Sequence, residues 1–321
     1  MKIGNREVNN PLVLGPMAGV TDWAFRNVCA GLGANITVTE MVSSRALIYK
    51  DQKSAKLLRK NEGSICGAQI FGNNPEIMAE AAVLALEISG CDFLDINMGC
   101  PMPKIANSGD GCGLMRTPEL AGQIVEAVAK AVDVPVTVKC RLGWDKGNIN
   151  VLDFTKRMED SGAAMVAVHG RTRAMLYSGV ADWDYIRKVK EQLHIPVIAN
   201  GDIVDAQSAL RCLKWTGADG LMIGRATFGD PWIFAEVRAA MAGEPIPERP
   251  CLKERVAVAI KQFEMAEADH GEKIACLEAR KHFAWYLRGV RNASYYKKEI
   301  SSLTTMADIY RVAKEIVRDL E

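Results

Sequence analysis

Eight short apolar runs recur along the chain and alternate with longer amphipathic stretches. Each run is rich in Val and Ile and ends in Gly, Pro or a polar residue, which is typical of strands buried on both faces of a parallel sheet. Eight strand–helix units of this size predict a (β/α)8 TIM barrel. The predicted strands cover residues 12–16, 36–41, 65–71, 93–97, 136–141, 165–170, 196–201 and 220–224.

Helical patterns at 74–89, 117–132 and 205–217 begin at capping or first-turn residues and end near glycines. An open doubly wound sheet is the structural alternative. The barrel is favoured because polar residues lie at or just past nearly every strand end, where a barrel brings them to one face. These residues are Glu40, Gln69, Asn97, Lys139, His169, Asn200 and Arg225.

The alternation stops at residues 244–250, where three prolines indicate a linker. Residues 251–321 then carry helical patterns and no strand-like run. We therefore expect a catalytic barrel over residues 1–243 and a small all-helical domain of three or four helices over 251–321.

The composition limits the possible partners and locations. The 321 residues are 49% hydrophobic and 25% charged, with a net charge of +1, so no global charge bias points to nucleic acid or membrane. The N-terminus lacks a signal-peptide pattern, and no apolar window is long enough to span a bilayer. We expect a cytoplasmic monomer, in which any nucleic acid meets a local patch.

The nine cysteines are odd in number and scattered, with no CxxC pair, which argues against zinc and iron–sulfur sites. Eight are expected to be buried or inert thiols in a reducing compartment. Cys100 differs because Gly99 and Pro101 hold it on a stiff turn just past a buried strand, in DINMGCPMPK (95–104). From the residues alone, Cys100 could act as a nucleophile or as a general acid, and we favour the general acid.

Other strand ends suggest a phosphorylated ligand with a polar ring. Gly201, Gly224 and Arg225 lie where loops of such barrels bind phosphate. Lys139 and His169 suit the polar edge of a flavin, although a Schiff-base lysine of an aldolase explains Lys139 equally on chemistry alone.

These segments together resemble the tRNA-dihydrouridine synthases, with the bacterial B-type branch as the closest pattern. The motifs occur in order over residues 11–235, and the tail ARKHFAWYLRG (279–289) is similar as well. The loop GDGCGLM (109–115) departs from the family pattern at Cys112 and Gly113. The matching motifs are PMAGVTD (16–22), DINMGCPMPK (95–104), VTVKCRLGW (136–144), VHGRTR (168–173), IANGDI (198–203) and MIGRA (222–226).

The resemblance implies an FMN enzyme that uses NADPH or NADH to reduce uridines of the tRNA D-loop. It makes Cys100 the proton donor and gives Asn97 and Arg171 contacts to the uracil. The altered loop at 109–115 is expected to position the substrate or Cys100. The cofactor residues implied are Pro16, Met17, Ala18, Gln69, Lys139, His169, Asn200, Gly201, Asp202, Gly224 and Arg225.

Basic residues interleaved with aromatic ones in the tail suit phosphate contact and stacking. We expect Arg280, Lys281 and Arg288 to bind tRNA, while Phe283 and Trp285 pack on the barrel. Three rivals remain at this point: a dihydroorotate-dehydrogenase-like flavoenzyme, a lysine-dependent aldolase, and an RNA-binding protein without catalysis.

Overall fold

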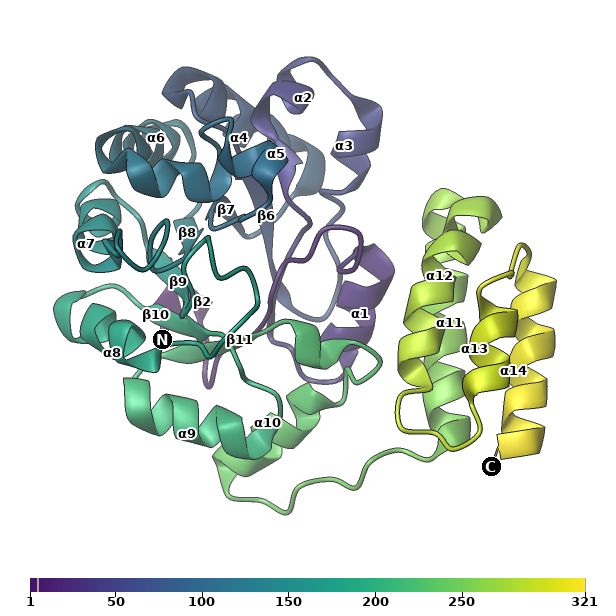
Figure 1. The fold of residues 1–321 in the computed structure, drawn as a ribbon. Coiled ribbons are helices and arrows are strands. Elements are labelled where there is room, and N and C mark those ends of the chain that lie inside the picture. The colour runs from purple at the N-terminus through teal and green to yellow at the C-terminus, as the bar shows by residue number, and fades with distance from the viewer. Residues whose placement is uncertain (5, 321) are drawn as a thin grey trace.

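The computed structural model describes residues 1–4 and 6–320. In this part of the chain, eight parallel strands close into a barrel, because β4 pairs with β6 and β11 pairs with β3 (Figure 1). The predicted barrel is therefore confirmed, and the open sheet is excluded. The ring runs through β3 (Leu12–Leu14), β4 (Ile36–Val38), β6 (Ile65–Phe71), β7 (Phe93–Met98), β8 (Val136–Cys140), β9 (Met165–His169), β10 (Val197–Asn200) and β11 (Gly220–Ile223).

Helices cover the outside of the ring, and their ends follow the capping signals. The Asn74 side chain accepts from Ile77 N at 2.9 Å, and Asp205 accepts from Ser208 N at 2.6 Å. Gly90 ends α4 in the left-handed conformation. The helices are α1 (Trp23–Gly31), α2 (Ser44–Ile48), α3 (Gln52–Lys56), α4 (Pro75–Ser89), α5 (Pro103–Ala106), α6 (Pro118–Ala131), α7 (Val151–Asp160), α8 (Trp183–Gln192), α9 (Ala206–Thr216) and α10 (Ile233–Ala242).

Alternate residues of the strands fill the barrel interior. Phe93, Met165 and Ile198 belong to one buried apolar cluster near the amino ends of the strands. A side chain at Gly67 would overlap the Phe93 ring, so the glycine leaves room for that ring. A hairpin of β1 (Lys2–Ile3) and β2 (Arg6–Glu7) adds Ile3 to this cluster. One end of the barrel is thus closed by packing, and the other end carries the polar residues.

A coil over residues 244–250 leads to α11 (Leu252–His270), α12 (Glu272–Tyr286), α13 (Ser294–Ile300) and α14 (Met306–Leu320). These helices share their own buried apolar cluster and lie side by side next to α1 (Figure 1). Trp285 of α12 stacks on Phe228 of the barrel, with ring centroids 4.3 Å apart. Among the helices described, none is long and apolar enough to cross a membrane.

Candidate active site

A chain of hydrogen bonds joins β6, β7 and β8 inside the open end of the barrel, which we call the barrel mouth. Asn97 Nδ2 donates to Gln69 Oε1 at 2.9 Å, and Gln69 Nε2 donates to Asp95 Oδ2 at 2.6 Å. Thr137 donates to the other Asp95 oxygen at 2.5 Å. Burial raises the pKa of Asp95 to about 6, so the carboxylate is ionised at neutral pH and fixes which way the Gln69 amide points.

Lys139 and His169 bring one charged and one neutral group into the mouth. Lys139 Nζ donates to Asn200 Oδ1 at 3.4 Å. Burial, together with the nearby Arg141 charge, lowers the pKa of Lys139 to about 8, which leaves it mostly cationic at pH 7. Burial lowers the pKa of His169, and the cations Lys139, Arg141, Arg171 and Arg225 lower it further. The imidazole is therefore neutral.

The loop after β10 is shaped by Gly201 and Asp202. Gly201 has φ +117°, and a Cβ there would lie 2.8 Å from the Ala181 Cβ, so this position favours glycine. Asp202 accepts from Arg171 Nη2 at 2.8 Å and lies 3.6 Å from the Arg225 guanidinium. Its carboxylate orients two cations at the rim, next to the glycine turn.

The turn after β3 forms the neighbouring wall of the mouth. Met17 O accepts from Thr21 N at 3.0 Å, and Met17 N donates to the Thr21 hydroxyl at 2.9 Å, which closes the turn. A Cβ at Gly224 would lie 3.6 Å from Met17 Sδ. The wall of Pro16, Met17 and Ala18 therefore adjoins the glycine turn after β11.

Cys100 is half-buried at the top of β7. Its N–H donates to Asn97 Oδ1 at 2.9 Å, and its carbonyl accepts from Cys112 N at 3.1 Å. Burial raises the pKa of the Cys100 thiol, with only partial opposition from Arg141 and Lys139. The group is a neutral thiol at pH 7, which favours proton donation over nucleophilic attack.

Comparison with known proteins shows to which family this chain belongs. A model of the family described as dihydrouridine synthase matches residues 13–320. The chain belongs to the dihydrouridine synthase family. It is 40% identical to tRNA-dihydrouridine synthase B of Pasteurella multocida over 95% of this chain and 92% of that protein. It is 42% identical to the protein of the same name from Vibrio vulnificus over 94% of each.

The family match and these relatives together show that the function of this chain is tRNA dihydrouridine synthesis, which is an oxidoreductase reaction. Distant solved structures agree on the fold. Histamine dehydrogenase from Rhizobium sp. 4-9 superposes with a TM-score of 0.61 at 14% identity, over 83% of this chain and 50% of that chain. The chain thus spans about half the length of that structure, and the likeness concerns the fold alone.

Most residues implied by the family resemblance converge on the mouth. Four basic residues that were expected to bind the substrate have other surroundings. Arg171 is buried and its guanidinium bonds Asp202, Ser178 O and Gly179 O, so it orients the loop. In the tail, Arg280 donates to Leu303 O, and Lys281 donates to Gly19 O. Arg288 is exposed. Three of these four arginine and lysine side chains therefore already bond groups within the protein.

The eight thiols expected to be buried or inert differ in exposure. Cys251 is exposed at the start of α11. The cysteines that are buried are Cys29, Cys66, Cys91, Cys112, Cys140, Cys212 and Cys276.

Three further residues of the site were not found from the sequence. Asp95 lies two positions before Asn97, and strand alternation places both inside the barrel. Arg141 lies two positions after Lys139, and its Nε donates to Gly99 O at 3.0 Å. The Arg225 guanidinium lies over the Tyr177 ring, 4.7 Å from the centroid of that ring. The period of two was a usable signal for Asp95 and Arg141, whereas the loop holding Tyr177 has no such period.

Proposed function

We propose that the barrel mouth binds FMN and reduces the C5=C6 bond of uridines in the tRNA D-loop, with NADPH or NADH as the electron donor. The observation that carries the proposal is the neutral Cys100 thiol in the same mouth as the Lys139 cation and the oriented Gln69 amide. An aldolase would instead need a lysine that is free to attack a carbonyl. The burial that lowers the pKa of Lys139 would suit such a lysine too, so the family match over residues 13–320 is what favours the flavin enzyme over the aldolase.

The residues of the mouth suit a flavin mononucleotide. Gln69 and Lys139 offer donors to the polar edge of its ring, and neutral His169 lies beside them. Met17 and its neighbours offer an apolar wall to the ring face. The backbone at Gly201 and Gly224, with the half-exposed Arg225 cation, suits its phosphate. Asn200 and Asp202 complete this set by holding Lys139, Arg171 and Arg225 in place.

When bound, the cofactor supplies the hydride that goes to C6 of the uracil. Cys100 supplies the proton that C5 then needs, and a thiol with a raised pKa keeps this proton at neutral pH. Asn97 fixes the Cys100 backbone through its side-chain oxygen. The balanced reaction is uridine + NADPH + H⁺ → dihydrouridine + NADP⁺. The target base must leave its stack to reach the mouth.

The remaining features of the chain support an arrangement in two parts. Residues 1–243 act as the catalytic barrel, and residues 251–321 act as a helical tRNA-binding domain joined by the linker 244–250. The separate apolar cluster of α11–α14 supports this division. We place the protein in the cytoplasm, where tRNA and NADPH are available, and expect it to act as a monomer.

Purified protein supplied with FMN, NADPH and unmodified tRNA tests the proposal. We expect FMN to bind, NADPH to be consumed only when tRNA is present at substrate levels, and nucleoside mass spectrometry to detect dihydrouridine. Free uridine monophosphate at the same concentration is the control substrate and should react far more slowly. FMN-loaded protein that leaves every tRNA uridine unchanged would contradict the proposal.

A further inference from the structure

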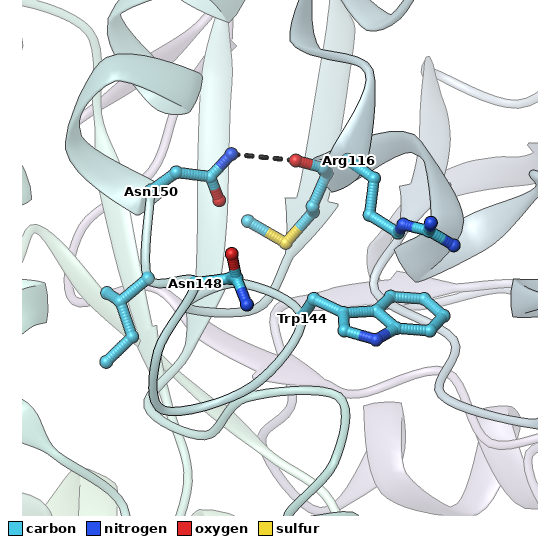
Figure 2. A pocket seen from close by; sticks show the side chains of 6 residues that line it. Arg116, Trp144, Asn148 and Asn150 are labelled. Atoms are coloured by element: carbon cyan, nitrogen blue, oxygen red, sulfur yellow. Dashed lines mark hydrogen bonds between the residues drawn. The ribbon is translucent and has the colours of Figure 1, made fainter.

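A cavity of about 620 Å³ opens beside the mouth, between the loop after β8 and the 3-10 helix η1 (Gly111–Arg116). Its volume is within the range of about 300–1,000 Å³ typical of ligand sites. The roles described above use none of its lining side chains. They are Met115, Arg116, Trp144, Asn148, Ile149 and Asn150, and Figure 2 shows how they surround it.

Two cations lie against the single aromatic ring of this cavity. The Arg116 guanidinium lies 4.8 Å from the Trp144 ring centroid, and the Arg173 guanidinium lies 4.6 Å from it. In the described part of the chain, Arg173 Nε is buried without an acceptor. Two positive groups on one flat ring suit a ligand that combines an anion with a planar ring.

Hydrogen-bond acceptors occupy the other side of the cavity. Asn150 Nδ2 donates to Met115 O at 2.7 Å, which fixes the amide. Its oxygen has no donor among the described residues, and Figure 2 shows the oxygens of Asn148 and Asn150 facing the same space. An N–H or amino group on the edge of a nucleobase would satisfy such a pair.

The walls of the cavity are connected to the catalytic turn. Trp144 follows Arg141 in the loop after β8, and Arg141 bonds the carbonyl of Gly99. On the opposite wall, Cys112 of η1 donates to the carbonyl of Cys100 at 3.1 Å. A ligand in the cavity would therefore contact the two segments, the loop after β8 and η1, that hold the Cys100 turn.

We propose that this cavity binds a ribonucleotide of the tRNA that flanks the reduced uridine, with its base on Trp144 in place of the exposed Arg116 guanidinium, which turns to the phosphate. The proposal rests on the function proposed above and adds a second contact point for the same substrate. Holding a flanking nucleotide keeps the target base out of its stack while it is reduced. NADPH also carries ribonucleotides, so the experiment separates these two sources.

Trp144→Ala in the FMN-loaded enzyme tests the assignment. Loss of one base–aromatic stack weakens binding about 5- to 150-fold, and we expect the Kd for tRNA to rise within this range. Trp144→Phe should recover most of the affinity. Trp215→Ala is the matched control, because Trp215 is 57% exposed on the outer helix α9 and bonds Asp184.

Arg116→Gln is a second variant, which changes an exposed side chain and spares the fold. It should lower the slope of log Kd against log salt concentration by about one, since one phosphate contact is lost. Unchanged tRNA affinity in both variants would overturn the proposal. A raised KM for NADPH with unchanged tRNA affinity would also overturn it, because the cavity would then bind the donor. Failure of the wild-type enzyme to reduce any tRNA would instead refute the proposed function itself.

Discussion

The thiol of Cys100 illustrates how burial selects a chemical role. A nucleophilic cysteine needs a lowered pKa, whereas burial raises the pKa of Cys100. We expect Cys100→Ala to retain FMN and to lower the rate of uridine reduction about 10²- to 10⁴-fold, the usual worth of a general acid. Single-turnover oxidation of the pre-reduced enzyme by tRNA measures this rate.

Cys251→Ser is the matched control for that measurement, since Cys251 is the exposed thiol at the start of α11. Wild-type single-turnover rates in Cys100→Ala would remove the thiol from the proton path.

The residues of the site were predictable to different extents. Gln69, Asn97, Lys139, His169 and Asn200 could be found because each is a polar side chain on an otherwise apolar strand. The roles of Arg171, Arg280 and Lys281 could not be read in this way. Their charges suggested ligands, but each bonds carbonyl or carboxylate groups supplied by segments distant in sequence or by a loop of irregular shape.

At the level of elements, all eight barrel strands lie where the apolar runs predicted them, since each run is long enough to show burial on both faces. The hairpin of β1 and β2 and the short strand β5 (Val42–Ser43) were missed. Each contains two residues, which is too few to establish a period. β1 and β2 pair with each other while Ile3 packs at the barrel end, and β5 pairs with the last two residues of β6.

The conformation of η1 depends on a glycine at position 111, and a substitution of Gly111 tests whether η1 supports catalysis. Gly111 has φ +54°, and a Cβ there would lie 3.1 Å from the Cys100 Cβ. We expect Gly111→Ala to displace the Cys100 turn and to lower kcat on tRNA at least tenfold. We also expect the backbone strain at a positive φ to lower the free energy of unfolding by about 1–3 kcal/mol. Steady-state kinetics and a urea titration measure the two effects.

Gly217→Ala provides the comparison, because Gly217 has φ +65° and open space around its Cβ position. It should show a similar loss of stability with wild-type kcat. Equal kcat in both variants would separate η1 from the catalytic turn.

His282 of α12 should make the packing of the C-terminal helices sensitive to acid. Its ring is buried between Phe25 and Trp285, and burial lowers its pKa to about 3. The unfolded chain binds a proton at its ordinary pKa of about 6.5, so this group lowers stability as the pH falls from 6.5 toward 3. At pH 5 the loss is about 2 kcal/mol.

We expect His282→Phe to remove this loss, as measured by urea unfolding at pH 5.0 and 7.5. His194→Gln, at an exposed position, should keep the wild-type dependence on pH. A His282→Phe protein that loses as much stability as the wild type between these two pH values would refute the assignment.

At the scale of the whole molecule, specific contacts hold the C-terminal helices against the barrel. Gly229 leaves room for the Trp285 backbone, where any Cβ would lie 2.1 Å from its carbonyl. Lys281 bonds Gly19 O next to the wall of Pro16, Met17 and Ala18, and Arg59 pairs with Asp269. These contacts fix the tail relative to the mouth, so charges on the tail keep a set distance from the mouth.

We propose that the exposed basic groups after α12 are the part of the tail that contributes most to RNA contact. Arg288, Arg291, Lys297 and Lys298 are all exposed, whereas Arg280 and Lys281 are engaged within the protein. Changing these four exposed residues to Gln should weaken tRNA binding and reduce the slope of log Kd against log salt concentration by about three. Arg211→Gln with Lys214→Gln, on the exposed face of α9, is the matched control and should leave the slope unchanged. An unchanged slope in the fourfold variant would place the RNA contacts on the barrel instead, because phosphate contacts with the tail would then contribute nothing measurable to binding.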